Sequence, residues 1–285
     1  MTVTFKTIYG VDFSGAKLAG ENMWIAETRM RRLGRGWRLE LLELDSVAAL
    51  CGTAERAAAM VYLVKRIASS EDALWAMDFP FGLPIEVMEH RAPWRRQFDF
   101  LQGFGEDAYA AGLECLRRAK ALGGPNHIRR CTDHEAKAPF DCYHYRIIYQ
   151  TFHGMRDVLG KLDGTKGTAI LPFQYRRLPS ATRVLVEACP SSTLKRLNLP
   201  HQSYKQAAGG PLTPKRRRTR NAIIKGLTEH IAVPAALIRR IMRNPGGDAL
   251  DAVIAAVGGF HAWTAADHQS IARHARYRRE GRLFV

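Results

Sequence analysis

Three short apolar stretches of this chain each end on a carboxylic acid, and this repeated pattern is what most constrains its fold. The stretches are Tyr9-Gly10-Val11-Asp12, Trp75-Ala76-Met77-Asp78 and Val184-Leu185-Val186-Glu187. Short apolar runs that are closed by turn residues are typical of buried β-strands. An ionised carboxylate among apolar neighbours is costly to bury alone, so each acid needs a cation, hydrogen-bond donors or a proton.

The segments between these strands predict an α/β chain with a mainly parallel sheet. Residues 23–30 and 37–44 are two further strand candidates, and Arg35-Gly36 between them indicates a hairpin turn. Asp45-Ser46 can cap a helical region that runs to residue 67. A helix between a hairpin and the next strand suits a crossover that makes this strand parallel to an earlier one.

A long, mainly helical segment separates the fourth strand candidate from the fifth. It covers about residues 85–180, and we expect it to be an accessory insertion in a single domain of residues 1–285. After the fifth strand the sequence predicts a basic helix at 215–230, a short helix at 234–242 and a last long helix at 248–263.

The position of the three acids favours a metal site. The carboxyl ends of parallel strands lie side by side and are where ligands bind in such sheets. Three carboxylates there would repel one another unless a divalent ion lay among them, and hard oxygen ligands suit Mg²⁺ or Mn²⁺. The alternative is that each acid simply ends its strand in a turn, where Asp is common. The repetition of the pattern favours the metal.

The last helix adds two more acids. Asp248 and Asp251 are three residues apart and therefore share a helix face, together with small alanines. Asp248 could instead cap the helix or complement its dipole. Asp251 lies within an apolar helix, so it calls for a partner more strongly than Asp248 does.

Four motifs carry a resemblance to a known group of proteins. They are Gly10-Val11-Asp12-Phe13-Ser14-Gly15, Met77-Asp78-Phe79-Pro80-Phe81-Gly82-Leu83-Pro84, Val186-Glu187-Ala188-Cys189-Pro190 and Asp248-Ala249-Leu250-Asp251-Ala252. In this order they resemble the motifs of the predicted RNase H-like nucleases, an uncharacterised family related to Holliday-junction resolvase-like enzymes. The end of the chain, 280–285, is also similar to the usual end of that group. The resemblance implies an RNase H-like fold, in which helices flank a five-stranded mixed sheet on both faces.

The resemblance also implies an activity and a set of residues. Asp12 matches the acid of the first strand and Asp78 that of the fourth, where resolvases usually have Glu. The last helix matches the paired helix acids of the resolvase-like members, and Glu187 belongs to the uncharacterised group alone. The implied mechanism is phosphodiester hydrolysis with two Mg²⁺ or Mn²⁺ ions. The implied catalytic and metal-binding residues are Asp12, Asp78, Glu187, Asp248 and Asp251.

The charge of the chain supports a polyanionic partner. The formal net charge is +16, and it is clustered in a basic helix and an arginine-rich tail at 273–282. We therefore expect a nucleic acid, DNA or RNA, as the partner. The candidate contacts are Lys17, Lys215, Arg216, Arg217, Arg218 and Arg220. The alternative for each basic segment is an ordinary solvated face.

Two other functions are compatible with these features. One is a non-catalytic nucleic-acid-binding protein on the same fold, which needs the basic surface but not the acids. The other is a phosphotransferase of the actin-like ATPase class, because Asp12 followed by Ser14-Gly15 and Lys17 is faintly similar to its first phosphate motif. The oligomeric state stays open, although a junction-cutting enzyme would be expected to be a homodimer.

Cysteines and histidines crowd into one irregular segment, 123–144. Cys131, His134, Cys142 and His144 are residue types that bind zinc, but their spacing matches no standard ligand pair. A structural zinc site is therefore the weaker interpretation beside a substrate-facing loop or an ordinary insertion. The odd number of cysteines without a CxxC pair, and the lack of a secretory or membrane-spanning segment, predict a cytoplasmic protein with reduced thiols.

Overall fold

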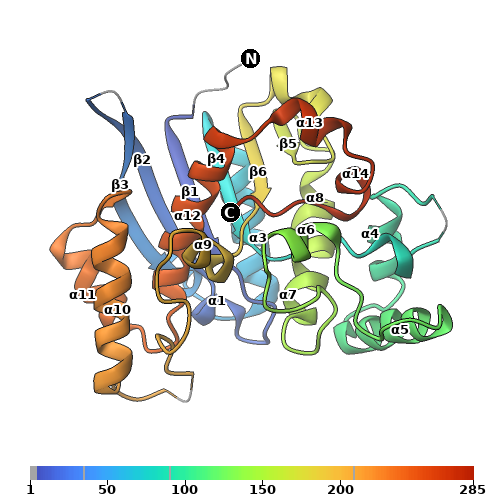
Figure 1. Ribbon diagram of the computed structural model, residues 1–285, viewed down its shortest axis with the longest axis horizontal. Coiled ribbons are helices and arrows are strands. Elements are labelled where there is room, and N and C mark those ends of the chain that lie inside the picture. Colours follow the sequence, from blue (N-terminus) through green and yellow to red (C-terminus); the bar gives the residue numbers. More distant parts are fainter. Residues whose placement is uncertain (1–4, 35, 90, 208) are drawn as a thin grey trace.

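A seven-stranded mixed sheet forms the centre of the molecule (Figure 1), in the strand order β5-β6-β4-β1-β2-β3-β7. The computed structural model describes residues 5–34, 36–89, 91–207 and 209–285. The strands are β1 (Thr7–Asp12), β2 (Trp24–Leu33), β3 (Gly36–Ser46), β4 (Ala73–Asp78), β5 (Thr168–Ile170), β6 (Arg183–Glu187) and β7 (Ile231–Ala232). The α/β class is confirmed. The expectation of only five strands is wrong, because β5 and β7, too short to show a pattern in the sequence, extend the sheet at its two edges.

The strand directions follow the predicted order of strand, hairpin, helix and strand. β2 is antiparallel to both β1 and β3, and β4 is parallel to β1. The crossover is α3 (Arg56–Ser69), which a separate short helix, α2 (Val47–Cys51), precedes. Ser46 caps α2 rather than α3, and Gly52 ends α2 with a left-handed φ of 79°. In the hairpin turn, Arg35 lies outside the described residues.

Side chains alternate between two cores on opposite faces of the sheet, as the period of a β-strand requires. On β4, Leu74 and Ala76 face the core that contains α12 (Asp248–Ala265), whereas Trp75 and Met77 face the core that contains α3. Figure 1 shows these two helices on opposite sides of the sheet. This alternation decides which strand-end acids can meet.

Small residues let α12 lie close to the sheet. A Cβ placed on Gly10 of β1 would come within 2.0 Å of the backbone oxygen of Ala252, and one on Gly259 within 2.4 Å of the Cβ of Ala76. The bulky side of the helix, which includes Leu250 and Val253, is buried as well. The close approach brings the first turn of α12 to the carboxyl ends of β1 and β4.

The segment between β4 and β6 is mainly helical, as expected, but it also supplies β5. Its elements are η1 (Ile85–Val87), α4 (Arg96–Gln102), α5 (Ala108–Ala121), α6 (Cys131–Glu135), α7 (Ile148–His153), the π-helix η2 (Gly154–Leu159), α8 (Gly160–Leu162) and η3 (Tyr175–Ser180). Many of its apolar residues join the core on the α3 side of the sheet, among them Cys115 and Phe152. In Figure 1 these helices lie on the right.

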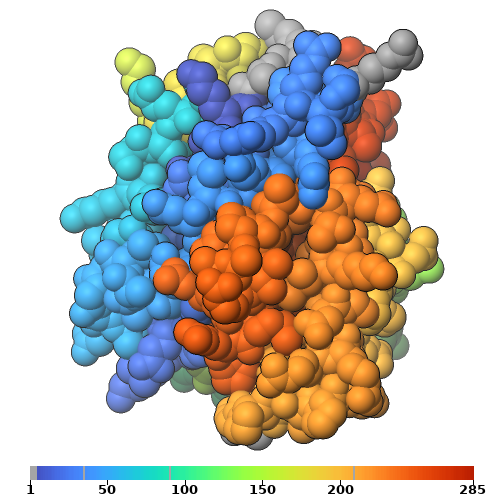
Figure 2. Space-filling model, turned by 90° about the vertical axis from the view of Figure 1, so that its left-hand side faces the viewer, coloured from blue at the N-terminus to red at the C-terminus, as the bar shows by residue number. Residues whose placement is uncertain are grey.

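The remaining helices are α1 (Ala19–Asn22), α9 (Pro190–Arg196), α10 (Pro214–Leu227), α11 (Ala235–Arg243), α13 (His268–Arg273) and α14 (Tyr277–Glu280). Figure 2 shows α10 and α11, in orange, packed beside the blue β2–β3 hairpin. Within the described ranges, no helix combines the length and the apolar character that crossing a membrane requires.

Candidate active site

Asp12 and Asp78 lie next to each other at the carboxyl ends of two parallel strands. They are paired in register across β1 and β4. Because Gly10 and Ala76, two positions earlier, face α12, both acids also face this helix. Asp12 is only 5% exposed. The structure therefore brings together the first-strand and fourth-strand acids that the sequence predicted.

The first turn of α12 adds Asp251 and Asp248. Asp251 is 1% exposed, and its Oδ1 accepts a hydrogen bond of 2.8 Å from the hydroxyl of Tyr204. Asp248 does not cap the helix. Instead the side chain of Asn244 accepts hydrogen bonds from the backbone N–H groups of Gly247 and Ala249, and its Nδ2 donates to Asp248 Oδ2 at 3.2 Å. The carboxyl of Asp248 is thus left beside the other three acids.

Lys205 is a cation of this cluster, and its charge opposes the rise in the pKa of Asp12, Asp78 and Asp248. Its ammonium forms an ion pair with Oδ2 of the buried Asp251, although the lysine side chain as a whole is 46% exposed. Lys205 was not among the predicted site residues, because a single lysine in a polar connection carries no signal. Only the folded loop places Lys205 and the neighbouring Tyr204 in contact with Asp251.

Burial dominates the electrostatics of the cluster. It raises the pKa of the Asp12 carboxyl well above its usual range, while Lys205 opposes the rise and Asp251 adds to it. It raises the pKa of Asp78 to about 7, again with a contribution from Asp251. The pKa of Asp248 is raised for the same first reason. These raised pKa values indicate that the nearby positive charge does not offset the cost of burying the carboxylates.

The donor chemistry of the cluster fits a hard divalent cation, but its present arrangement does not enclose one. Four carboxylates offer the oxygen ligands that Mg²⁺ and Mn²⁺ prefer. As the side chains stand, however, no three Asp, Glu, His or Cys residues in the described part of the chain are grouped to hold a metal. The ammonium of Lys205 instead takes a place beside Asp251.

Two adjoining cavities open onto the cluster, and basic side chains line both. One, of about 530 Å³, is bounded by Asp12 and Asp248 and includes Lys17 and Arg56. The other, of about 570 Å³, is bounded by Asp12, Asp78 and Asp251. Its basic members are Lys205 and Arg216. An anionic ligand can therefore reach the carboxylates between basic groups.

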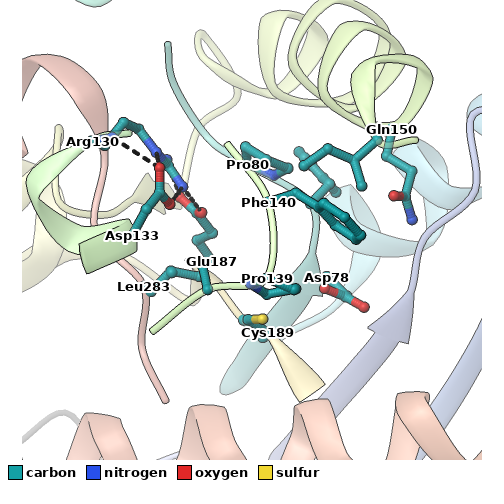
Figure 3. A pocket seen from close by; sticks show the side chains of 14 residues that line it. Asp78, Pro80, Arg130, Asp133, Pro139, Phe140, Gln150, Glu187, Cys189 and Leu283 are labelled. Carbon is teal, nitrogen blue, oxygen red and sulfur yellow. Dashed lines mark hydrogen bonds and ion pairs between the residues drawn. The ribbon is translucent and has the colours of Figure 1, made fainter. Parts of the chain in front are cut away.

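Glu187 belongs to a different cluster, on the opposite face of the sheet. It pairs in register with Met77, one residue before Asp78, so its side chain points away from α12. Both of its oxygens accept hydrogen bonds from Arg130, at 2.5 and 2.9 Å, and Arg130 also binds Asp133. Figure 3 shows Glu187 turned toward Arg130 and away from Asp78. The prediction that Glu187 joins the other acids is therefore corrected.

Arg220 also departs from its predicted role. It is fully buried, and its guanidinium donates to the backbone oxygens of Tyr204, Ile241, Asn244 and Pro245. A side chain with 0% exposure does not offer itself to a nucleic acid. The other predicted contacts remain accessible to a ligand. Lys17, Lys215, Arg217 and Arg218 are exposed, and Arg216 is half-buried.

The segment considered for zinc forms no such site within the ranges that the structure describes. Burial raises the pKa of the Cys131 thiol to about 12, and that of Cys142 well above its usual range. No disulfide joins any of the five cysteines.

Comparisons with protein-family models, with curated proteins and with solved structures found no match.

Proposed function

We propose that this protein is a nuclease of the RNase H-like class that hydrolyses phosphodiester bonds with Mg²⁺ or Mn²⁺. The observation that carries the proposal is the convergence of Asp12, Asp78 and Asp251 at one opening. They come from two adjacent parallel strands and a helix that are far apart in the sequence. Burying acids together costs free energy, so such a cluster is retained for a cation or for chemistry.

The topology supports the fold part of the proposal. The RNase H-like fold that the motifs imply is a mixed sheet with helices on both faces. Five central strands, β3-β2-β1-β4-β6, form such a sheet, with a crossover helix between β3 and β4. The edge strands β5 and β7 extend this arrangement without interrupting it.

In the proposed mechanism Asp12, Asp78 and Asp251 hold the cations, and Asp248 lies at the rim of the same site. When bound there, divalent ions would lower the pKa of an attacking water and offset the charge on the leaving oxygen. Two features of the chain bear on cation binding. Tyr204 fixes the orientation of Asp251 through its hydrogen bond. The raised pKa of Asp78, about 7, means that this carboxyl must release its proton to ligate a cation, so cation binding should weaken as pH falls below 7.

The basic side chains around the two cavities position the substrate. Lys17 and Arg56 line one cavity, and Arg216 lines the other. Exposed cations on α10 extend the same positive surface. Contacts of this kind hold the phosphate backbone in register over the reacting bond without selecting a sequence.

A cleavage assay tests this proposal. The purified protein should cut at least one member of a panel of labelled single-stranded, duplex and branched DNA and RNA when Mn²⁺ is present, and EDTA should stop it. Asp12→Asn should abolish the cutting, because it removes one buried carboxylate from the centre of the site. Asp99→Asn is the matched control, since the side chain of Asp99 is 68% exposed on α4. An intact panel, or an active Asp12→Asn variant, would refute the proposed activity.

One observation favours a second function, that of a non-catalytic nucleic-acid-binding protein. Lys205 already compensates Asp251 as a fixed internal cation. If that is its permanent role, binding should be salt-sensitive but unchanged by EDTA and by Asp12→Asn, with no cleavage in the same panel.

A further inference from the structure

We infer that the insertion carries a stacking platform for unpaired nucleobases, so that the substrate of the proposed site is a single-stranded nucleic acid. The inference rests on the proposed function for its partner class. The platform consists of Phe140, His144, Tyr145, Arg146 and Tyr149. They lie in and just before α7, and three of them, Phe140, Arg146 and Tyr149, line the two cavities of the acid cluster.

Three rings of the platform are close neighbours, one pair of them stacked and the other tilted. The ring centroids of Phe140 and His144 are 4.6 Å apart with an angle of 26° between the rings, and those of His144 and Tyr145 are 4.5 Å apart at 33°. The guanidinium of Arg146 lies 5.6 Å from the Phe140 centroid and 5.7 Å from that of Tyr145. Phe140, His144 and Tyr145 thus form one aromatic surface with the Arg146 cation beside it, and Tyr149 lines the same cavity as Arg146.

The outer rings of this surface have no partner in the core. Tyr145 is 63% exposed and Tyr149 is 42% exposed. A lone exposed tyrosine is ordinary, and Tyr109 on α5 is one at 52%. Two exposed tyrosines that flank an exposed arginine in the sequence, in a segment that lines the cavities of the acid cluster, provide both an apolar and a cationic component.

The platform is held at a defined position relative to Asp12. Tyr149 and Arg146 line the cavity that Asp12 and Asp248 bound, and Phe140 lines the cavity of Asp78 and Asp251. The connection to β1 is tight, because a Cβ on Gly15 would come within 2.1 Å of the backbone oxygen of Tyr149. The Nε2 of Gln150 also donates a hydrogen bond of 2.6 Å to the backbone oxygen of Phe13. The platform is thus coupled to the strand that carries Asp12.

These features fit a single strand better than a duplex. Paired bases in a duplex have both faces covered by their neighbours, whereas an unpaired base offers a free face to an aromatic ring. Such stacking tolerates any base, and cations beside it bind the backbone. Lys17 and Arg56 share a cavity with the platform, and Arg216 lies across the second one. A strand that crosses the acids can place its phosphates on these cations and its bases on the rings.

Binding in EDTA tests the inference without any need for cleavage. Fluorescence anisotropy would compare a labelled oligothymidylate with a blunt duplex of the same length. The full-length wild type should bind the single strand at least about tenfold more tightly. Tyr145→Ala and Tyr149→Ala should each weaken this binding by about tenfold and leave duplex binding nearly unchanged, since each removes one stacking ring.

Three controls make the result specific. Tyr145→Phe keeps the ring and should bind like the wild type. Tyr109→Ala removes an equally exposed tyrosine from α5 and should have no effect. Arg146→Gln should lower the slope of log affinity against log salt by about one, which the tyrosine variants should not do.

Wild-type preference for the duplex, failure to bind either probe, or alanine variants that bind like the wild type would overturn the platform. A protein that shows the single-strand preference but cuts nothing with Mn²⁺ would keep the platform and refute only the proposed nuclease activity. The two tyrosines are exposed, so unchanged thermal unfolding of the variants is the expected check that they fold.

Discussion

At the scale of single residues, the proton on Asp78 reports most directly on the state of the site. Burial and the charge of Asp251 raise its pKa from 3.8 to about 7. Between these two values the folded protein keeps a proton that the unfolded chain has released, so the free energy of unfolding falls as pH rises. One such proton changes it by about 1.4 kcal/mol per pH unit.

We therefore expect Asp78→Asn to gain stability relative to the wild type as pH rises. Asparagine resembles the protonated carboxyl, so the advantage should grow between pH 4 and pH 7, where the pKa of Asp78 lies, and then level off. Urea unfolding in EDTA across this range measures it. The exposed Asp99→Asn variant should follow the wild type. A difference between Asp78→Asn and wild type that does not change with pH would contradict the buried, proton-holding carboxyl.

Lys205 allows a second prediction at this scale, because its ammonium and a metal ion would compete for Asp251. Lys205→Met keeps the length of the side chain and removes its charge. We expect the variant to be less stable in EDTA by about 1–2 kcal/mol, a value reduced from that of a fully buried pair because the lysine is half exposed. We also expect it to bind Mn²⁺ about tenfold more tightly by calorimetry.

The control for Lys205 is Lys215→Met, which removes an exposed lysine from α10. It should change neither stability nor Mn²⁺ affinity. Weaker Mn²⁺ binding by Lys205→Met would mean that the lysine supports the cation rather than substitutes for it.

Register decides which of the predicted acids meet. The sequence was sufficient to place Asp12, Asp78 and Glu187 at strand ends. Their faces depend on strand pairing, and a shift of one residue reverses the side. Asp12 pairs with Asp78, but Glu187 pairs with Met77 and so turns to Arg130. The register between neighbouring strands cannot be read from the sequence of either strand.

At the scale of elements, Arg220 joins α10 to both segments that carry the site. Its hydrogen bonds to Tyr204 and to Asn244 and Pro245 hold the loop of Lys205 against the start of α12. Arg220→Met should lower the free energy of unfolding by about 3 kcal/mol or more, because several charged hydrogen bonds are lost and buried carbonyls lose their donors. Urea unfolding measures the loss.

Hydrogen exchange adds a local readout for the same variant. The amides near Tyr204 and near Pro245 should exchange faster than in the wild type. Arg217→Met, at an exposed position of the same helix, should stay within about 0.5 kcal/mol of the wild type. Equal effects of the two substitutions would contradict the structural role of Arg220.

The sequence of α10 distinguishes the buried Arg220 from the exposed basic residues of the same helix. Arg220, Ile223, Ile224 and Leu227 are spaced as one helical stripe, and all four are buried. An arginine on an apolar stripe is expected to be buried, whereas Lys215 and Arg218 lie on the opposite side of the helix and are exposed. The total charge of the segment does not reveal this periodicity. The strands β5 and β7, of three and two residues, carried no comparable signal, because their pairing and not their sequence creates them.

At the scale of the whole molecule, key acidic side chains are buried while many basic side chains lie at the surface. Asp12, Asp251 and Glu187 are at most 5% exposed, while much of the net charge of +16 lies on accessible side chains such as Lys215 and Arg217. A polyanion would therefore meet cations first and carboxylates only inside the cavities. The sequence predicted both sets of charges. It did not show that the sheet, the insertion and the loop of Lys205 converge on one opening, because that convergence depends on tertiary packing.

If the aspartates form a divalent-cation site, a crystal soaked in Mn²⁺ should show the ion bound among them. We predict an anomalous peak within about 2.3 Å of carboxylate oxygens of Asp12 and Asp251, with the ammonium of Lys205 withdrawn from Asp251. A crystal of Asp12→Asn soaked in the same way should lack the peak. A wild-type crystal with no Mn²⁺ among these acids, and with Lys205 still paired to Asp251, would show that the aspartates do not form a divalent-cation site.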